Sequence, residues 1–554
     1  MAAPFHASPG LYATGLLASL GAAEIGRAYE HGLFEILGWA LTAGFAVATL
    51  AETARRVLRL FAWHQVKAKD KVFGRADFAS RGDLKRAGLL GTRSADGIFL
   101  GAAQGALLCY APQTHLLTVA PAGGGKTSGI ALPNLLHTTA LAGADAARSM
   151  VVTGKDGELS GMMYRRAKAM MPSSVIINPY GILGLPNDGF NPLQRCLDLA
   201  ADGSPDVVLA AEGKMKILIH EPEHGGDNGF FRVGGRQIGS YVTCYLAIVR
   251  PEDCHLPKLQ ELVSSGDADL MGLLMEMSQS DVADGYCARG AKRIQSLMVN
   301  SERTFAGQIA ELQQALAIFD GYSTLAKSIT RSEFKPSVIK EQPSIVFIEL
   351  PEDKVDILAP YVALVIDELV RAGMDHPSKQ PTVHFLMDEF QRLPVMDSLV
   401  TGLFRGRSSG LIFQPIIQDF QSLKKYGDNA SAYRTQSDVV QMFGIRAVPD
   451  AEYLETRIGQ QTVETANLSL PQGAVDQFQV NHGAQGAPRL RKDEILQTPQ
   501  GLQYIVHKSD PVILGEIVPW WEVDPWRGWP NDNPKEGGAP PGRPRYRIRY
   551  RRQS

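Results

Sequence analysis

VAPAGGGKTSG, residues 119–129, is the stretch of sequence that decides the fold. An apolar run at 115–120 leads into it and a helical pattern follows, which is the strand, glycine loop and helix order of a phosphate-binding P-loop. The glycines let backbone N–H groups turn toward a phosphate, and the following helix adds the positive end of its dipole. The stretch therefore predicts a nucleotide site, although Ala120 stands where the common pattern has glycine.

The residue types in this loop predict individual roles. Lys126 is expected to reach the β- and γ-phosphates and to act in catalysis, and the Thr127 hydroxyl is expected to ligate Mg²⁺. ATP and Mg²⁺ are thus the expected cofactors. The residues predicted to bind the nucleotide are Ala122, Gly123, Gly124, Gly125, Lys126, Thr127 and Ser128.

The second half of the site is predicted at TVHFLMDEF, residues 382–390, where a mostly apolar strand ends in two carboxylates. Asp388 fits the Walker B residue that holds Mg²⁺. Glu389 fits the base that orients the attacking water. A strand ending in Asp-Glu is common by itself, but together with the glycine loop it favours hydrolysis over simple binding.

Two further catalytic candidates follow this strand. Gln418 ends the next apolar run, LIFQPIIQ, where its amide either hydrogen-bonds the γ-phosphate or lytic water or only caps a surface turn. Pro415 within that run predicts a break or an edge strand. Arg407 and its neighbour Arg405 are expected in a loop, as arginine fingers toward a neighbouring subunit, as contacts to DNA phosphates, or simply in solvent.

Alternating strand and helix patterns predict an α/β fold with a parallel sheet, interrupted by an all-α domain. The predicted domains are a membrane anchor at 1–71, a nucleotide-binding domain in two parts at 72–200 and 325–525, an all-α substrate-recognition domain at 201–324, and a flexible linker with an Arg-rich tail at 526–554. The predicted strands are 115–120, 149–154, 174–179, 344–350, 382–387, 410–413, 438–444 and 501–507.

Apolar runs near the N-terminus predict the membrane anchor. Residues 33–51 carry Glu35 as their only charge, and their length is close to the roughly 20 residues that span a bilayer. Residues 10–23 form a shorter run that suits a second span, an interfacial helix or a buried helix. Lys and Arg follow the longer run and are missing from the first ten positions, so the remainder is expected on the cytoplasmic side. A cleaved signal peptide is the rival interpretation, which the missing basic start weakens.

Composition excludes other classes of protein. A net charge of −2 with 21% charged residues excludes a uniformly basic nucleic-acid binder. The five cysteines have no metal-ligand spacing, and their odd number argues against a disulfide framework. Six arginines among the last twelve residues alternate with Tyr546 and Tyr550, which suits single-stranded nucleic acid, an anionic membrane or an acidic protein.

Taken together, these motifs resemble the TraG-type coupling proteins, the membrane-anchored ATPases of type IV secretion and conjugation. Alanine at the position of Ala120 is common in that family. The resemblance rests on FGRADFASRGDLKRAGLL (73–90), APAGGGKTSG (120–129), GKDGELS (154–160), GFNPL (189–193), MDEFQRLP (387–394), GRSSG (406–410) and QDFQSLKKYG (418–427).

The resemblance implies a RecA-like P-loop NTPase domain, two N-terminal transmembrane helices in the bacterial inner membrane, and assembly into a hexamer. It also implies ATP-driven transfer of relaxase-bound single-stranded DNA to the inner-membrane components of a type IV secretion system. Two alternatives stay open, a translocator of effector proteins only and a nucleotide-gated adaptor that docks substrates without pumping. Asp388 and Glu389 disfavour the adaptor, because such a pair suits hydrolysis.

Overall fold

The computed structural model divides the chain into two units, and each is described by itself. The larger unit comprises residues 76–459 and 488–554, and the smaller comprises residues 1–75 and 460–487. The residues that the structure describes are 39–44, 46–47, 50, 74, 76–90, 97–144, 147–220, 228–469 and 479–550.

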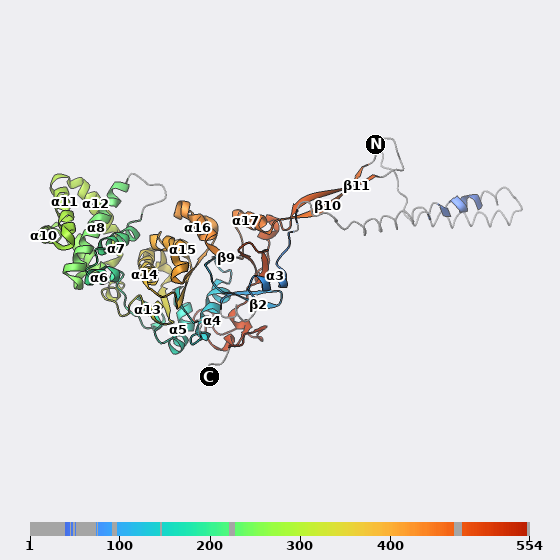
Figure 1. Cartoon of the computed structure of the whole chain (residues 1–554), viewed down its shortest axis with the longest axis horizontal. Helices are drawn as coiled ribbons and strands as arrows, with labels where there is room; N and C mark the ends of the chain where they lie inside the picture. Colours follow the sequence, from blue (N-terminus) through green and yellow to red (C-terminus); the bar gives the residue numbers. More distant parts are fainter. Residues whose placement is uncertain are drawn as a thin grey trace. The chain divides into compact units, whose positions relative to one another are not determined.

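The smaller unit contains a two-stranded sheet that is not predicted from the sequence. Its strands are β10 (Gln460–Ser469) and β11 (Gln479–Pro488), which lie side by side in Figure 1. The Thr462 hydroxyl donates a hydrogen bond to the carbonyl oxygen of Gly74 over 3.3 Å. Polar residues dominate both strands, so neither has the apolar alternation by which a strand is recognised.

The predicted membrane spans fall mostly outside the described residues. Residues 10–23 lie wholly outside them, and within 33–51 the structure describes 39–44, 46–47 and 50, which are helical. Among the residues that the structure describes, no helix has both the length and the apolar character needed to cross a bilayer. The membrane anchor therefore stays a prediction.

An 11-stranded sheet forms the centre of the larger unit (Figure 1). Its order is β2-β1-β13-β12-β9-β3-β8-β7-β4-β6-β5. The strands from β9 to β5 in this order pair in parallel, whereas the pairs from β2 to β9 are antiparallel. The bounds are β1 Ile98–Ala103, β2 Ala106–Tyr110, β3 His115–Val119, β4 Arg148–Lys155, β5 Val175–Ile177, β6 Ile345–Leu350, β7 Thr382–Met387, β8 Leu411–Ile417, β9 Ser437–Met442, β12 Leu502–His507 and β13 Ile513–Glu516.

The predicted α/β class with a parallel sheet is confirmed, since every predicted strand is present as one of β3 to β9 or β12. The antiparallel strands β1, β2 and β13 are not predicted. Their sequences, IFLGAA, ALLCY and ILGE, are short and contain glycine or alanine, which weakens the strand signal.

The sequence predicts a break or a sheet edge at Pro415. In the structure Pro415 instead lies inside β8, between β3 and β7. On one side Pro415 is the register partner of Met387 in β7. On the other side β3 pairs with β8 only at Ile416 and Ile417. The missing N–H group of proline is tolerated in this central strand because the β3 ladder begins one residue later.

Helices cover both faces of the sheet, and successive strand residues point to opposite faces. Val151 of β4 belongs to the hydrophobic core that contains α14 (Val355–Asp375) and α15 (Asp397–Ser409). Its neighbours Met150 and Val152 belong to the core that contains α4 (Leu132–Ala140) and α5 (Glu158–Met170). Each parallel strand is thus buried on both sides, which explains its nearly continuous apolar sequence.

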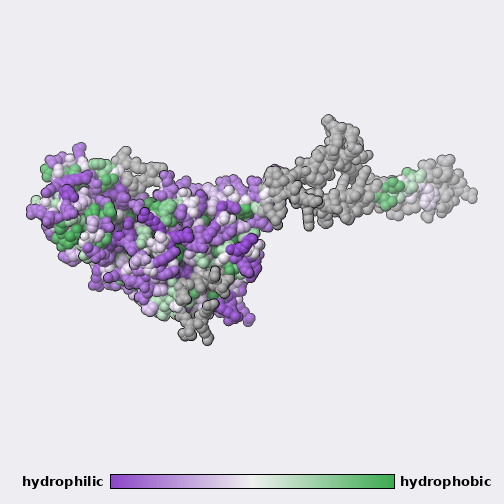
Figure 2. Space-filling view, in the orientation of Figure 1, coloured by the Kyte–Doolittle hydropathy of each residue, from purple (hydrophilic) through white to green (hydrophobic). Residues whose placement is uncertain are grey.

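A series of helices fills the interval between β5 and β6. It lies in the region expected to be all-α, and none of the described residues 194–220 and 228–328 is in a strand. Figure 2 shows several hydrophobic patches on the surface of these helices. The principal helices are α6 Gln194–Ala201, α7 Val207–Leu218, α8 Gly229–Val249, α9 Leu256–Ser264, α10 Asp267–Ser278, α11 Tyr286–Asn300 and α12 Glu302–Leu316.

The segment after residue 525, expected to be a flexible linker and tail, is packed on the larger unit as far as the structure describes it. Trp526 is fully buried, and its indole N–H donates to the Tyr550 hydroxyl over 2.8 Å. His137 Nδ1 lies 2.8 Å from the same hydroxyl. β15 (Tyr546–Arg547) pairs in parallel with β14 (Val523–Asp524). Aromatic residues make these contacts, whereas the prediction of a flexible segment rests on its proline and glycine content.

The arginines and tyrosines of this segment also contact protein groups. Arg547 pairs with Asp524 over 3.1 Å, and Arg545 pairs with Glu516 over 3.0 Å. The ring of Tyr550 packs against His137. These arginines and Tyr550 thus have partners within the larger unit, and the choice among nucleic acid, membrane and acidic protein as the ligand of the tail stays a prediction.

Candidate nucleotide site

The glycine loop joins the end of β3 to η1 (Thr127–Ala131), a turn that continues into α4. Gly123 and Gly125 have φ angles of 72° and 89°, in the left-handed region that glycine adopts without strain. The Gly129 N–H donates to the Gly125 carbonyl oxygen over 2.8 Å, which starts the helix directly after the loop. The sequence TVAPAGGGKTSG thus folds into the predicted strand, loop and helix.

Ala120 lies below the loop rather than in its phosphate-facing part. Its side chain is fully buried in the core formed with α4 and α5, and its N–H donates to the Ile417 carbonyl oxygen over 2.8 Å. A methyl group at this position therefore adds apolar contact without approaching the loop. The packing explains why alanine replaces glycine here.

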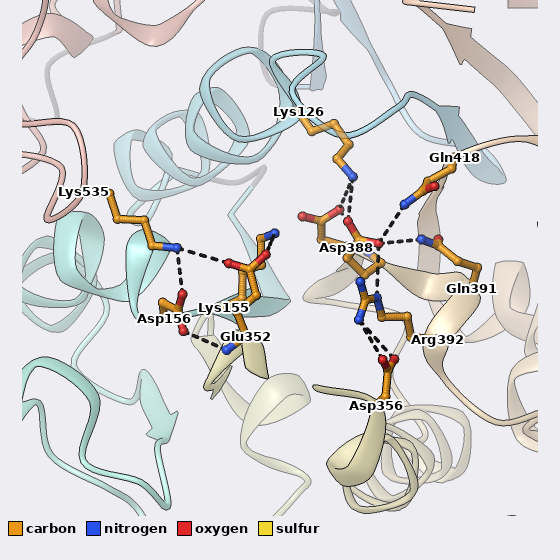
Figure 3. A network of polar contacts seen from close by, with 11 residues as sticks. Lys126, Lys155, Asp156, Glu352, Asp356, Asp388, Gln391, Arg392, Gln418 and Lys535 are labelled. Atoms are coloured by element: carbon orange, nitrogen blue, oxygen red, sulfur yellow. Dashed lines mark hydrogen bonds and ion pairs between the residues drawn. The ribbon is translucent and has the colours of Figure 1, made fainter. Parts of the chain in front are cut away.

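Lys126 contacts both acidic residues that follow β7. Its Nζ atom lies 3.2 Å from Asp388 Oδ1 and 3.1 Å from Glu389 Oε1 (Figure 3). The three residues meet because β3, β8 and β7 are neighbouring parallel strands, whose carboxyl ends share one edge of the sheet. The structure brings together residues that are more than 260 positions apart.

The charges of this cluster stabilise one another despite partial burial. Desolvation opposes the charge on Lys126, but the attraction of Asp388 and Glu389 outweighs it and raises the lysine pKa. Desolvation likewise opposes the charge on Glu389, and the nearby Lys126 ammonium lowers the pKa of that carboxyl below its usual range. Both groups are therefore charged at neutral pH.

The Asp388-Glu389 turn is held in place by neighbouring side chains. The Asp388 N–H donates to the Thr153 hydroxyl over 2.8 Å. Gln391 donates to Glu389 Oε2 over 2.5 Å. Glu389 itself has a φ of 50°, which is unusual for a residue other than glycine and costs about 1 kcal/mol or more. Such an outlier at a strand end is typical of a functional site.

Gln418 belongs to the same cluster. It directly follows β8, and its Nε2 atom donates to Glu389 Oε2 over 3.4 Å (Figure 3). The side chain is exposed toward solvent. This position allows the amide to contact Glu389 and a group bound beside it.

Arg407 and Arg405 are not brought to this cluster. They lie exposed in the last turns of α15, not in the expected loop. Since α15 returns from the carboxyl end of β7 to the amino end of β8, its last turns lie at the opposite edge of the sheet from Glu389. The 13 residues of α15 correspond to a length of about 20 Å.

The acidic cluster and the glycine loop line one cavity of about 550 Å³. Its size lies within the usual range for a ligand site, roughly 300 to 1,000 Å³. Predicted loop residues that line it are Ala122, Gly123, Gly125, Lys126, Thr127 and Ser128, whereas Gly124 does not. Other lining residues, not predicted from the sequence, are Leu132, Lys155, Glu158, Trp520, Trp521, Asn533, Lys535, Glu536, Gly537, Gly538 and Pro540.

A family model described as "Type IV secretory system Conjugative DNA transfer" matches residues 66–528. The chain belongs to this family. Among curated proteins, conjugal transfer protein TraG of Escherichia coli is 24% identical over 501 residues, covering 82% of this chain and 76% of that protein. Protein VirD4 of Agrobacterium fabrum is 22% identical, covering 74% of this chain and 58% of that protein.

Solved structures of the bacterial conjugative coupling protein TrwB share the fold of this conjugative DNA transfer protein. An unbound form has a TM-score of 0.59 at 16% identity, covering 82% of this chain and 95% of the other. TrwB in complex with ADP and Mg²⁺ has a TM-score of 0.58 at 17% identity and covers 82% and 96% of the two chains. At this level of identity the likeness establishes the fold.

One wall of the cavity lies outside the part of the chain that matches the family. The match ends at residue 528, whereas Asn533 to Pro540 line the cavity together with the glycine loop. Only Trp520 and Trp521 of the C-terminal lining residues fall within the match. These C-terminal lining residues therefore lie beyond the matched range.

A buried carboxylate supports the turn beside the cavity. Glu349, near the end of β6, accepts hydrogen bonds from the N–H groups of Gly157 over 3.2 Å and Ser160 over 3.1 Å. These donors lie at the start of α5, where a negative group is favoured. Burial nevertheless dominates and raises the pKa of Glu349 to about 7.

Proposed function

We propose that this chain is a membrane-anchored ATPase that recruits relaxase-bound single-stranded DNA and drives its transfer by ATP hydrolysis through a type IV secretion system. The observation that carries the proposal is the meeting of Lys126, Asp388 and Glu389 at a cavity lined by the glycine loop. Membership of the conjugative DNA transfer family indicates the process in which the ATPase acts. TrwB, which has the same fold, is known in complexes with ADP and Mg²⁺ and with an ATP analogue.

Lys126 is proposed to exchange its partners when the nucleotide binds. Its ammonium group would leave Asp388 and Glu389 for the β- and γ-phosphates, which are stronger anionic partners. The loop N–H groups would bind the same phosphates, supported by the positive end of the helix that begins at Thr127. Asp388 and Glu389 then become free to bind Mg²⁺ and to accept a proton from water, respectively.

Thr127 and Asp388 fit the Mg²⁺ site. Both line the cavity beside Lys126, and hydroxyl and carboxylate oxygens are the ligands that Mg²⁺ takes from proteins. Among the residues that the structure describes, no group of three or more His, Cys, Asp or Glu side chains could hold a metal ion. In the proposal, substrate phosphates supply further ligands to the ion, which would neutralise phosphate charge.

Glu389 is proposed to act as the base. It would accept a proton from a water molecule as the water oxygen attacks the γ-phosphorus and the bond to the β–γ bridging oxygen breaks. Departure of Lys126 removes the strongest of the cations that lower the Glu389 pKa, so the carboxylate becomes a better base when the phosphates are in place. Gln418, within 3.4 Å of Glu389, would orient the water.

Arg407 is proposed to act between subunits. Because it lies at the opposite edge of the sheet from Glu389, it cannot reach the site of its own subunit. In a ring of subunits, such as a hexamer, it would lie against a neighbour's γ-phosphate and stabilise transition-state charge. The ring would sit at the bacterial inner membrane beside the other inner-membrane components of the secretion system.

The proposal is tested by phosphate release from ATP with and without single-stranded DNA. The full-length chain is compared with Lys126→Ala and Glu389→Gln, and with Lys508→Ala as a lysine control outside the cavity. We expect DNA to stimulate wild-type turnover, and both site variants to lose turnover by at least about 100-fold. Turnover that DNA does not change would favour effector-protein cargo, and no turnover with intact ATP binding would favour an adaptor.

A further inference from the structure

The C-terminal residues 529–540, which we call the C-terminal strap, are firmly built onto α5. The Asn531 N–H donates to the Met162 carbonyl oxygen over 3.0 Å, and its side chain donates to the Gly161 carbonyl oxygen over 3.0 Å. Arg166 lies over the Trp529 ring at 3.9 Å. The strap is thus positioned by contacts on the same helix that begins beside the cavity.

The tip of the strap is a closed turn. Asn533 and Gly537 exchange two backbone hydrogen bonds of 2.8 Å. The Asn533 side-chain oxygen accepts from the N–H groups of Lys535 and Glu536, over 2.8 and 3.2 Å, and its amide donates to Glu158 over 3.0 Å. This turn fixes the backbone of Lys535 at the rim of the cavity.

Lys535 is held by two carboxylates beside the cavity. Its Nζ atom lies 2.8 Å from Asp156 Oδ2 and 3.6 Å from Glu352 Oε2, as Figure 3 shows. The hydrogen bond from Lys535 lowers the pKa of Asp156 despite some burial. The lysine side chain is 40% exposed, so its ammonium group is free to move to a stronger anion.

Three lysines line the cavity, and each is paired with a carboxylate. Lys126 contacts Asp388 and Glu389, while Lys155 lies 2.6 Å from Glu352, the residue that also pairs with Lys535. Once their carboxylate partners are exchanged, three cations around one cavity can contact more than one phosphate of a polyanion. A nucleoside triphosphate is the polyanion that fits a glycine loop.

We propose that Lys535 is a nucleotide-binding residue: the C-terminal strap supplies it as a further cation for the phosphates, at the cavity that the glycine loop also lines. On binding it exchanges Asp156 and Glu352 for phosphate oxygens, as Lys126 exchanges its own carboxylates. The inference rests on the proposed nucleotide site and extends it to residues beyond the family match. It makes the strap part of the site, where the sequence predicts a flexible linker.

The test is the binding of a fluorescent mant-ATP to the full-length chain. Lys535→Ala is expected to weaken binding about fivefold, the effect of one partly exposed charge contact. Lys535→Arg, which keeps the charge, should stay within about twofold of the wild type. Lys508→Ala is the matched control, because Lys508 is 38% exposed, pairs with Asp438 and lies outside the cavity, and it should leave binding unchanged.

Asp156→Asn separates a direct contact from a purely structural one. If Lys535 binds phosphate, loss of the Asp156 charge frees the lysine, so binding is unchanged or tighter. If Lys535 only fastens the strap, Asp156→Asn weakens binding as Lys535→Ala does, and the inference is overturned. Thermal melting of each variant checks that the fold is intact.

Lys126→Ala distinguishes failure of the inference from failure of the proposed function. If Lys126→Ala loses binding while Lys535→Ala binds mant-ATP as tightly as the control Lys508→Ala, only the proposed role of Lys535 is overturned. Binding unaffected by Lys126→Ala means that the nucleotide does not use the glycine loop, and both proposals fall. Binding weakened in both Lys126→Ala and Lys535→Ala, with Asp156→Asn unimpaired, supports both.

Discussion

Lys126 and Lys214 each contact an adjacent Asp-Glu pair, but the two clusters have different surroundings. Lys126 Nζ lies 3.2 and 3.1 Å from Asp388 and Glu389, at the wall of a cavity. Lys214 of α7 lies 2.6 and 2.5 Å from Asp367 and Glu368 of α14, and all three side chains are at most 2% exposed. The first lysine borders a cavity, as the proposed exchange of its carboxylates for phosphate requires, whereas the second is enclosed together with its carboxylates.

The buried cluster joins two parts of the larger unit. Lys214 comes from the helices between β5 and β6, and Asp367 and Glu368 come from a helix that covers the sheet. Arg371 adds a second cation 3.0 Å from Asp367. Burial opposes the charge on Asp367, but these cations outweigh it and lower its pKa to about 2. The same three residue types thus border a cavity at one place and join two parts of the larger unit at the other.

The largest predicted effect is on stability. Lys214→Ala leaves Asp367 and Glu368 buried with too little positive charge, and the free energy of unfolding should fall by about 3 to 5 kcal/mol. Lys126→Ala, at a cluster that borders a cavity, should lower it less, by about 1 to 2 kcal/mol. Denaturant unfolding of both variants measures the difference. Equal losses would show that the two clusters do not differ as the structure indicates.

Glu349 extends the comparison to a buried carboxylate that has no lysine. Burial raises its pKa to about 7 from 4.5. At pH below 4.5 the group is protonated in both states, and between about 4.5 and 7 only the unfolded chain releases the proton. Its contribution therefore destabilises the fold as pH rises through this window, by up to about 3 kcal/mol, and stays constant above it.

The Glu349→Gln variant should lack this contribution. Relative to the wild type, its free energy of unfolding is expected to improve from pH 4.5 to pH 7, as measured by denaturant titration at several pH values. Glu252→Gln, at an exposed position, is the control and should run parallel to the wild type. A Glu349→Gln curve parallel to the wild type would mean that Glu349 ionises normally in the fold.

The smallest predicted effect is that of replacing Gln418, which contacts Glu389 in the cluster with Lys126 and Asp388. Its 3.4 Å contact with Glu389 is long and exposed, so Gln418→Ala should lower kcat for ATP hydrolysis by about tenfold and change KM less than about twofold. Gln421→Ala, at a nearby exposed position, should leave both constants unchanged. Steady-state kinetics with ATP decides the outcome. A rise in KM alone would assign Gln418 to binding.

Much of the nucleotide site is predictable from local sequence because its parts are local patterns. The glycine loop, its strand and helix, and the carboxylates after β7 each have a short signature, and parallel strands then place their ends at one edge. The antiparallel strands β1, β2 and β13 lack such a signature, since glycine and alanine interrupt their apolar runs. The position of Pro415 depends on where β3 begins to pair, which the local sequence does not contain.

By itself the sequence determined the class of the sheet, the glycine loop and the residues Lys126, Asp388 and Glu389. Only the tertiary structure decided that Lys126 rests on these carboxylates, that Arg407 lies at the other edge of the sheet, and that the C-terminal strap borders the cavity. The physical reason is the distance along the chain over which each kind of interaction acts. Propensity and hydrophobic spacing act over a few residues, whereas Trp526 and Tyr550 hold the C-terminal segment through contacts with α4, about 400 positions earlier in the chain.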